Sequence, residues 1–569
     1  MSTHTLGIKV GVTSLWGHDP SAVLFEDGEL VFGVEEERYT REKHAVHTFP
    51  KNAIRACLDF ADISLGDVDE IAIPYDPTLA TKRAKHDLLT SIRQGQSISS
   101  KFYQAGKSII KTVKFRGFLI EQVANRLRSI GDPLPSITTW SHHRCHAVSA
   151  YYPAPFENGL IVTIDGAGEY DSTVVWRADG GELQRVRTYE YPNSLGTLYG
   201  VVTEYLGYRA NNGEGKVMGL APYGEFDEEI EEHLRNLIKT GVDYDVTRLL
   251  SSGFSQGVKR LEEQLGQPRR DPGAEFTQWH KNLAHTTQRM LEETVTSIVE
   301  HYCQEIGETN VGVAGGVALN CKMNKQVMEL PTVDTLYVQP VAHDAGVALG
   351  AGMLASEGTD CAMPTVYFGP SYSSDEVEAQ LETFKLDYSQ PDDLCRSVAS
   401  HIADGKLVGW FQSRLEFGPR ALGNRSILAD PRSVESRDRV NRFVKNREEW
   451  RPFAPSLRED EMDEYLVNAE RAPYMIKTFD VRDEKKDEIP AVIHAGDETT
   501  RPQTVTKQQN PRYYDLLTEF KDITGVPVLL NTSFNDHAEP IVTKPKEAIK
   551  DFFAMGLDVL VVEDFLIEK

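Results

Sequence analysis

The chain opens with a pattern of apolar and polar positions that is typical of a strand followed by a hairpin. Residues 7–13 form a short, mostly apolar segment, and after a polar loop, residues 21–26 and 29–35 alternate between apolar and polar positions. Asp27-Gly28 separates these two alternating segments. An Asp-Gly pair between two such segments is a strong signal for a two-residue turn. The pattern therefore predicts a strand, a loop and a β-hairpin.

The same order of elements returns after an offset of 152 positions. A second apolar strand ends at Asp165, and two alternating segments follow around Asp179-Gly180, which match Asp27-Gly28. A spaced match of this kind indicates a duplicated unit, with two unrelated hairpins as the alternative. Two copies of this pattern resemble the actin/hexokinase/Hsp70 class of nucleotide-binding folds. The resemblance implies two similar α/β lobes that face each other across a cleft.

Helical patterns and a linker complete the predicted organisation. Residues 82–130 are basic and helical by pattern, which favours a solvated helical insertion over a partner-binding face. Residues 277–306 have the spacing of a long amphipathic helix. A stretch with Pro, Gly and Ser at 360–375 predicts a boundary. We therefore expect two domains, residues 1–365 and 366–569.

Composition narrows the class of protein and its location. The 569 residues carry a net charge of −25, which argues against non-specific binding to nucleic acid or to an anionic membrane. The six cysteines show no C-x-x-C spacing, which argues against a disulfide framework and a structural zinc site. The start shows no signal-peptide pattern, and no stretch of 18 apolar residues occurs. We expect a cytoplasmic protein that does not span a membrane.

Two histidines and two aspartates form a candidate metal site. His142 and His146 lie four positions apart, which on a helix places both imidazoles on one face. Asp165 and Asp344 each follow a predicted strand. Two histidines with carboxylates suit Fe(II), Mn(II) or Zn(II) and leave positions open for a substrate. Surface or core histidines and plain turn aspartates are the alternative interpretation.

Two loops of the N-terminal half are candidates for contact with a phosphate or an adenine. Gly315-Gly316 follows a predicted strand, and glycine lets backbone N–H groups approach a ligand closely. Lys216 ends the Gly-rich stretch that begins at Asn212 and places one cation in a flexible loop. Neither loop matches a Walker A or G-x-G-x-x-G pattern, so tight structural turns explain them nearly as well.

The second domain concentrates basic residues within an acidic chain. Ten basic residues lie between positions 411 and 456, against six acidic ones. The planar guanidinium group of arginine suits phosphate, so we expect an anion pocket; a solvated basic face is the alternative. The candidate residues are Arg420, Arg425, Lys445, Arg447, Arg451, Arg501, Asn531 and Asn535.

Ten stretches in the same order together resemble the antibiotic and nodulation O-carbamoyltransferase family over essentially the whole chain. These stretches are 17–22, 35–38, 142–152, 165–166, 215–220, 314–317, 418–426, 451–455, 501–505 and 531–535. The N-terminal part is similar to the metalloprotein that transfers threonylcarbamoyl to tRNA, which has the actin-like (ASKHA) fold. The C-terminal part is similar to the YrdC/Sua-type α/β domain that makes carbamoyl adenylates.

The resemblance implies two reactions at two sites. In the C-terminal domain, carbamoyl phosphate and ATP with Mg would give carbamoyl-AMP and pyrophosphate. In the N-terminal domain, the carbamoyl group would pass to a hydroxyl of a small natural-product or sugar acceptor. A tRNA threonylcarbamoyl-type transferase, an actin-like sugar kinase and a non-catalytic nucleotide-binding regulatory protein are the alternatives, and the acidic charge favours a small acceptor over tRNA.

The resemblance also implies roles for single residues in a monomer or homodimer. The iron ligands would be His142, His146, Asp165 and Asp344, and the adenylate would lie at Gly166, Gly315, Gly316 and Asn320. The catalytic residues would be His18, Asp19 and Lys216, with His18 as the general base on the acceptor hydroxyl. The eight candidates of the second domain would bind carbamoyl phosphate and ATP. The chain departs from the family pattern at two positions. Cys145 would affect the choice of metal, and His343 would be an extra residue that contacts the metal ligands without binding the metal.

Overall fold

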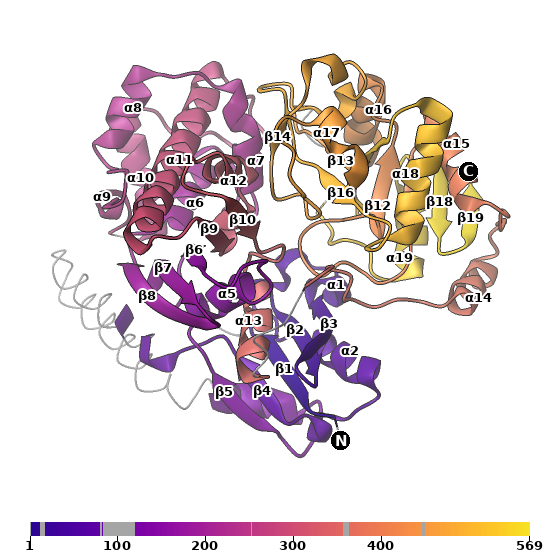
Figure 1. Cartoon of the computed structure of the whole chain (residues 1–569), viewed down its shortest axis with the longest axis horizontal. Helices are drawn as coiled ribbons and strands as arrows, with labels where there is room; N and C mark the ends of the chain where they lie inside the picture. Colours follow the sequence, from indigo (N-terminus) through magenta and orange to yellow (C-terminus); the bar gives the residue numbers. More distant parts are fainter. Residues whose placement is uncertain are drawn as a thin grey trace. The chain divides into compact units, whose positions relative to one another are not determined.

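A computed structural model describes eight segments of the chain, which form a mixed α/β fold (Figure 1). The described residues are 2–11, 17–79, 82–83, 120–251, 253–356, 363–445, 450–536 and 538–569. They divide into two compact units: Met1–Val31 with His47–Ala362, and Phe32–Val46 with Met363–Lys569. Most of the predicted insertion at 82–130 lies outside the described residues.

Two five-stranded sheets have the same strand order, which confirms the predicted duplication. They belong to the first unit, except that residues 32–35 at the end of β3 are grouped with the second. One sheet has the order β3-β2-β1-β4-β5 and the other has the order β8-β7-β6-β9-β10. Strand β1 pairs antiparallel with β2 and parallel with β4. In the same way, β6 pairs antiparallel with β7 and parallel with β9. The strands are β1 (His4–Lys9), β2 (Ser21–Glu26), β3 (Glu29–Glu35), β4 (Glu70–Ile73), β5 (Ser136–Thr139), β6 (Gly159–Ile164), β7 (Asp171–Asp179), β8 (Glu182–Glu190), β9 (Asn310–Ala314) and β10 (Thr335–Val338).

The two hairpin turns are equivalent, but the second lies one residue later than the sequence predicts. Asp27 and Gly28 both have positive φ, at 50° and 85°. In the second hairpin the positive values fall on Gly180 (56°) and Gly181 (90°), because Asp179 still belongs to β7. A turn with positive φ at both central residues matches the twist of a hairpin, and glycine adopts it without a steric cost.

Two helices bring the candidate metal site of the first unit together. Helix α5 (His142–Tyr151) packs against α13 (Gly346–Ala355), and α13 also packs against β1. A Cβ atom on Gly350 would lie only 1.9 Å from the carbonyl oxygen of Cys145, so only glycine permits this approach. The close packing places the start of α5, the start of α13 and the end of β1 near one another.

The described part of the first unit contains further helices besides α5 and α13. The predicted amphipathic helix at 277–306 is α11 (Gln278–Ile306), which ends at Gly307 with a left-handed φ of 74°. The others are α2 (Lys51–Ala61), α6 (Leu195–Tyr205), α7 (Glu214–Leu220), α8 (Glu228–Arg235), α9 (Thr247–Leu250), α10 (Phe254–Leu265) and α12 (Cys321–Met328).

The second unit is built on a seven-stranded mixed sheet of order β16-β13-β17-β12-β11-β18-β19. Its strands are β11 (Val408–Phe411), β12 (Arg425–Ala429), β13 (Ala454–Arg458), β16 (Gln503–Val505), β17 (Val528–Ser533), β18 (Val559–Val562) and β19 (Phe565–Glu568), beside a small pair, β14 (Phe479–Asp480) and β15 (Thr499–Thr500). Its helices are α1 (Glu37–Thr40), α14 (Ser374–Phe384), α15 (Leu394–Ala403), α16 (Val434–Arg439), α17 (Met462–Tyr465), α18 (Pro511–Thr524) and α19 (Pro545–Ala554).

Strand directions in this sheet gather distant segments at one end. Strand β17 runs antiparallel to both β12 and β13, and β16 runs parallel to β13. The carboxyl end of β17 therefore lies beside the amino ends of β12, β13 and β16. The loops that precede those three strands and the loop that follows β17 carry most of the predicted anion-binding residues.

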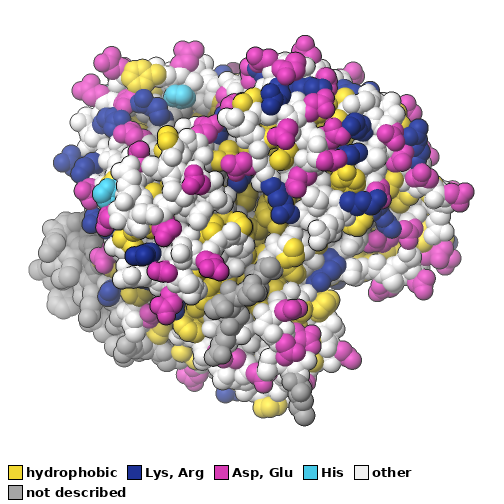
Figure 2. All heavy atoms as spheres, viewed as in Figure 1, with side chains coloured by type: hydrophobic (Ala, Val, Ile, Leu, Met, Phe, Trp, Pro, Cys, Tyr) yellow, Lys and Arg dark blue, Asp and Glu magenta, His cyan; other side chains and the backbone are white. Residues whose placement is uncertain are grey.

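The surface agrees with the composition. Figure 2 shows acidic side chains spread over the visible face with Lys and Arg between them. Among the described residues, no helix is both long enough and apolar enough to cross a bilayer.

Candidate metal centre and anion site

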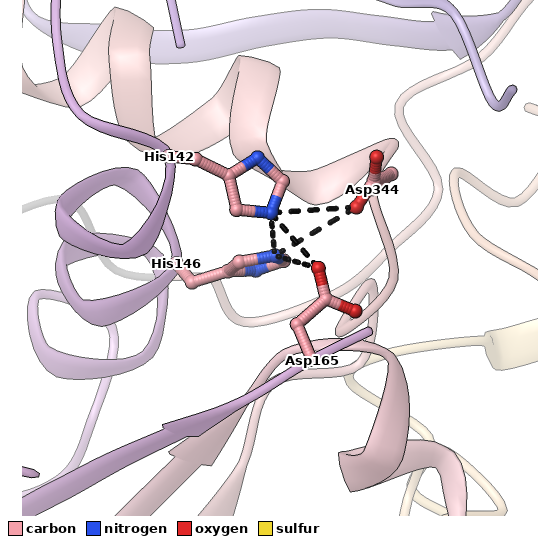
Figure 3. A group of neighbouring side chains, drawn as sticks. All are labelled: His142, His146, Asp165 and Asp344. Carbon is pink, nitrogen blue, oxygen red and sulfur yellow. Dashed lines mark hydrogen bonds and ion pairs between the residues drawn. The ribbon is translucent and has the colours of Figure 1, made fainter. Parts of the chain in front are cut away.

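Four predicted side chains of the first unit meet at one point (Figure 3). The Nε2 atoms of His142 and His146 lie 3.1 Å apart. Asp165 Oδ2 lies 2.9 Å from His142 Nε2 and 3.7 Å from His146 Nε2. Asp344 Oδ1 lies 3.5 Å and 3.9 Å from the same two nitrogens. The structure thus brings together all four residues that the sequence analysis selected.

Local structure explains why these residues converge. Ser141 precedes the first turn of α5, and the histidines project from one face of that helix as their spacing predicts. Asp165 directly follows β6, and Asp344 lies two residues before α13. Helix α5 packs against both β6 and α13, so it links the end of β6 to the start of α13.

The donor set and its spacing fit a first-row divalent cation. The four donor atoms all lie within 4.8 Å of one another. Nitrogen and oxygen donors bound at about 2.0–2.2 Å around one ion are separated by roughly the distances seen here. Imidazole and carboxylate ligands suit Fe(II), Mn(II) and Zn(II) alike, so these residues do not choose among the three metals.

Each carboxylate presents one oxygen to the histidines and has its other oxygen bound by the protein. Asp165 Oδ1 accepts a hydrogen bond of 3.2 Å from the backbone N–H of Gly316. Asp344 Oδ2 accepts one of 2.6 Å from the ammonium of Lys9, which is only 3% exposed at the end of β1. Lys9 is not among the predicted site residues, although a lysine within a mostly apolar strand is a signal for a buried partner.

A second residue that the sequence analysis missed, Glu169, holds the start of α5. Its Oε1 accepts hydrogen bonds from the backbone N–H groups of Asp76 (2.6 Å) and His142 (3.2 Å). Burial raises the pKa of Glu169 to about 7. A carboxylate at the amino end of a helix satisfies N–H groups that have no partner within the helix, and here it fixes the position of His142.

The four side chains shift one another's protonation. Burial opposes the charged form of His142, but Asp344 and Asp165 outweigh it and raise the pKa of His142. Burial lowers the pKa of His146. Burial also opposes ionisation of the aspartates, yet the histidines lower the pKa of Asp165 well below its usual range. Lys9, followed by His142 and His18, likewise outweighs burial and lowers the pKa of Asp344.

His18 and Asp19, the predicted catalytic pair, lie next to this cluster. His18 Nδ1 lies 3.0 Å from Asp19 Oδ2, and His18 Nε2 lies 3.9 Å from Asp344 Oδ2. Burial lowers the pKa of His18, but Asp344 and Asp19 outweigh it and raise the value to about 9. A divalent cation beside Asp344 would oppose that rise, because it would neutralise the carboxylate charge.

The other predicted residues of the first unit fall into two groups. Gly316 contacts Asp165 as described, and Gly315, at φ 94°, donates its N–H to the carbonyl of Ala342 at 3.0 Å. Both glycines therefore lie at the edge of the cluster. The carbonyl of Gly166 accepts hydrogen bonds from Ser194 (2.5 Å) and Thr197 (3.0 Å).

Asn320 and Lys216 have partners of their own. The Asn320 side chain caps α12, accepts from Gln288 at 3.0 Å and donates to it at 2.9 Å. The ammonium of Lys216 lies 4.7 Å from the centre of the Tyr208 ring, within the range of a cation–π contact.

The two departures from the family pattern lie outside the cluster. Cys145 is completely buried and packs in the core with Ala72, Val347 and Ala351. Burial raises the pKa of its thiol well above the usual range, so it behaves as a small apolar residue. His343 is half-buried and does not belong to the group of four.

In the second unit, side chains from four predicted stretches meet at one end of the seven-stranded sheet. Gln503 donates to the carbonyl of Leu422 at 2.7 Å and accepts from Ser456 at 2.7 Å. Asn531 donates to Ser456 at 2.9 Å and to Gln503 at 3.3 Å. Hydrogen bonds thus join the 418–426 loop to the segments around 451–456, 501–505 and 531–535.

The predicted lysine and arginine residues lie on or next to the same stretches of the chain. The ammonium of Lys445 donates to the carbonyl oxygens of Ser533 (2.6 Å) and Asn535 (3.1 Å) and to the Asn535 side chain (3.0 Å). Arg420, Arg451 and Arg501 are half-buried. Arg501 makes no hydrogen bond or ion pair with any residue that the structure describes. Arg447 lies outside the described residues.

Arg425 is the most deeply buried of the described candidate arginines, and the protein binds its guanidinium group. It is completely buried, stacks over Phe411 at 3.6 Å, and donates to the carbonyls of Gln412, Asn424 (2.9 Å) and Ser413 (3.0 Å). Burial lowers its pKa to about 10. We assign Arg425 a positioning role, in which it holds the loop between β11 and β12.

Two acidic residues that the sequence analysis did not assign hold the same loop. Glu416 Oε1 accepts hydrogen bonds from the backbone N–H groups of Leu422 (2.7 Å), Asn424 (2.9 Å) and Arg425 (3.2 Å). Glu35 Oε1 accepts one from Gly418 at 2.9 Å, while Arg38 donates to the Gly418 carbonyl at 2.7 Å. The loop that carries Arg420 is therefore fixed at both ends.

Glu35 is expected to make this loop less stable as the pH rises. Burial raises its pKa from 4.5 to about 7, although Arg38 lies beside it. A carboxyl group with a raised pKa in the folded state contributes stability below about pH 4.5, and this stability is lost as the pH rises through about 7. The loss from pH 5 to pH 8 is on the order of 3 kcal/mol.

Hydrogen exchange of the peptide around Gly418, compared between wild type and Glu35→Gln at each pH, measures this effect. The variant should show no loss of protection between pH 5 and pH 8 beyond the intrinsic change in exchange rate. Parallel pH profiles for the two proteins would contradict the assignment.

Comparisons with known proteins agree with the two-unit organisation. The family model described as carbamoyltransferase N-terminus matches residues 5–353, and the one described as carbamoyltransferase C-terminus matches residues 399–569. The chain is 38% identical to nodulation protein NolNO of Sinorhizobium fredii, over 97% of this chain and 79% of that protein. It is 39% identical to nodulation protein NolO of Bradyrhizobium diazoefficiens, over 75% of this chain and 79% of that protein.

A third relative, protein sll1178 of Synechocystis, is 36% identical over all of this chain and 97% of its own length. The two family models together cover most of the sequence and extend over both compact units. These matches establish the resemblance that the sequence motifs indicated, and the chain belongs to the carbamoyltransferase family.

Proposed function

We propose that this protein is an O-carbamoyltransferase that uses ATP and carbamoyl phosphate to carbamoylate a hydroxyl group of a small natural-product or sugar acceptor. The observation that carries the proposal is the His142, His146, Asp165 and Asp344 cluster in a chain of this family. The basic residues at one end of the sheet in the second unit support a separate phosphate-binding site. The similarity to two nodulation proteins supports a hydroxyl-bearing acceptor.

In the second unit, the proposed reaction has two steps. Water hydrolyses carbamoyl phosphate to carbamate and phosphate, and the carbamate oxygen then attacks the α-phosphorus of ATP, which forms carbamoyl-AMP and releases pyrophosphate. Arg420, Arg451 and Arg501 would neutralise the phosphates of the two substrates, because guanidinium groups form paired charge-assisted hydrogen bonds with phosphate oxygens. Gln503 and Asn531 join the surrounding segments and would orient the substrates. The adenosine part of carbamoyl-AMP provides binding energy that can position the carbonyl carbon for transfer to the acceptor.

In the first unit, the proposed reaction is transfer of the carbamoyl group to the acceptor. His142, His146, Asp165 and Asp344 would hold the divalent cation, which polarises a carbonyl or binds a phosphate oxygen when present. His18 would remove the proton of the acceptor hydroxyl, with Asp19 orienting its ring through the 3.0 Å contact. Gly315 and Gly316 would approach the adenylate through their backbone.

The experiment that tests the proposal is exchange of labelled pyrophosphate into ATP, with and without carbamoyl phosphate. Exchange that depends on carbamoyl phosphate is expected, and it would separate this activity from that of a sugar kinase or a nucleotide-binding regulatory protein. Transfer is then tested with hydroxyl-bearing acceptors by mass spectrometry. Exchange without any requirement for carbamoyl phosphate would contradict the proposed activation step.

Arg501→Ala should slow adenylate formation. Loss of one charge-assisted contact with phosphate costs about 2–3 kcal/mol, which corresponds to roughly 30- to 150-fold in rate. The matched control is Arg471→Ala in the same unit, whose arginine is 56% exposed and pairs with Glu459 at 3.3 Å. Pyrophosphate release measured in both variants should fall only in Arg501→Ala. An undiminished rate in Arg501→Ala would place the activation chemistry elsewhere.

A further inference from the structure

The two oxygens of Asp344 have different surroundings. Oδ1 faces His142 and His146 at 3.5 Å and 3.9 Å. Oδ2 accepts from the ammonium of Lys9 at 2.6 Å and lies 3.9 Å from His18 Nε2. In Figure 3 the oxygen without dashed lines points away from the imidazoles. One oxygen is thus directed to the candidate metal position and the other to a buried cation.

The contact between Lys9 and Asp344 joins residues 335 positions apart in the sequence and is almost completely shielded from water. The side chains of Lys9 and Asp344 are 3% and 6% exposed. A buried ammonium group requires a partner, because transfer of an unpaired charge from water into the protein is costly. Lys9 therefore has little freedom to leave Asp344, and Asp344 has little freedom to rotate.

Asp165 shows the same division through a different donor. Its Oδ1 accepts from the backbone N–H of Gly316, while Oδ2 lies 2.9 Å from His142. The four side chains consequently offer two nitrogens and two oxygens to a metal ion. First-row divalent cations bind up to six donors, so single-oxygen binding by both carboxylates leaves positions open. A carboxylate that turned to bind through both oxygens would fill one of them.

We propose that Lys9 is a positioning residue that restricts Asp344 to a single ligand oxygen and thereby keeps a coordination position open for substrate. This inference rests on the proposed function of the cluster as a metal centre. The charged and titratable groups that face the Asp344 carboxylate are Lys9 from β1, His18 from the loop after β1, His142 and His146 from α5, and Asp165 from the end of β6.

The test replaces Lys9 by Met, which has a similar length and no charge, and uses Co(II) as a spectroscopic probe. Wild-type protein should bind Co(II) and show visible absorption that changes when azide, a small anionic ligand, is added. Lys9→Met should still bind Co(II), but its bands should shift as the donor number rises. Its affinity for azide should fall by roughly tenfold or more. Tenfold is the lower limit of the losses that are typical when a group that orients a metal ligand is replaced.

The matched control is Lys477→Met in the second unit. Lys477 is 9% exposed and, within the described part of the chain, forms one ion pair, with Glu470 at 2.8 Å. Its loss therefore also removes a buried lysine and takes that partner from a carboxylate. This control should leave the Co(II) spectrum and the azide affinity unchanged. Lys9→Gln, whose amide ends short of the ammonium position, replaces Lys9→Met if that variant does not fold, and the same changes are expected.

A double-mutant cycle with Asp344→Asn shows whether Lys9 acts through Asp344. In the Asp344→Asn background, removal of Lys9 should cause no further spectral change, because the carboxylate that it positions is absent. A Lys9→Met spectrum and azide affinity equal to wild type would overturn the inference while leaving the metal centre intact. Failure of the wild-type protein to bind Co(II), Fe(II) or Mn(II) would instead overturn the metal centre, and this inference with it.

Discussion

The double variant His142→Ala/His146→Ala is expected to lose the bound metal that wild-type protein retains after purification without oxygen. The two imidazoles supply half of the four donor atoms, and their Nε2 atoms lie only 3.1 Å apart. The remaining carboxylates are partly neutralised by the ammonium of Lys9. The loss of metal affinity should exceed roughly 10- to 100-fold, which is the change typical when a residue that only hydrogen-bonds to a metal ligand is replaced.

Elemental analysis of the two proteins measures this loss. The matched control is His233→Ala/His301→Ala, which removes two histidines that pair with glutamates on α8 and α11, at 3.8 Å and 3.2 Å. The control should retain as much metal as wild type. Equal metal content in the His142/His146 variant and in wild type would end the assignment of these residues as ligands.

The sequence allowed the cluster to be predicted because each of its parts has a local signature. The spacing of His142 and His146 indicates one helix face, and Asp165 and Asp344 each follow a strand. Strands β6 and β10 belong to one sheet and both run parallel to β9, so their carboxyl ends lie at the same edge. Lys9 and Glu169 have no such signature. Their roles depend on contacts with Asp344 and His142 that only the folded chain creates.

The arginine cluster shows a limit of charge patterns. Arg420 and Arg425 lie in one motif, and charge alone gives them equal weight as phosphate ligands. The structure separates them, because Arg425 is completely buried and its guanidinium binds backbone carbonyls. Burial of a single arginine depends on the packing of the whole loop. The residues next to it in the sequence therefore do not predict which arginine is buried.

Segment 32–46 shows a second limit. The alternating pattern around Asp27-Gly28 predicts the hairpin, and the structure confirms it. The pattern does not reveal that the chain then belongs to the second unit, where Glu35 and Arg38 bind Gly418. That contact joins residues more than 380 positions apart. It depends on a loop whose sequence carries no signal for its partner.

His18→Asn is expected to separate the two proposed half-reactions. An acceptor hydroxyl is a weak nucleophile, and histidine is the side chain best suited to remove its proton near neutral pH. His18 is in place beside the cluster, 3.0 Å from Asp19 and 3.9 Å from Asp344. The alternative is that His18 only orients its loop or binds a phosphate. Both of its carboxylate contacts lie in the first unit, whereas the proposed adenylate chemistry belongs to the second.

If His18 is the general base, His18→Asn should make carbamoyl-AMP at a near-normal rate and transfer the carbamoyl group roughly 10²- to 10⁴-fold more slowly. A quench assay that follows adenylate and carbamoylated product separately measures both steps. His4→Asn is the matched control, because His4 lies on β1 and contacts Glu26 at 3.8 Å, and both steps should proceed normally in it. Loss of adenylate formation in His18→Asn, or full retention of transfer, would show that His18 is not the base. In either case, the loop between β1 and β2 would have another function.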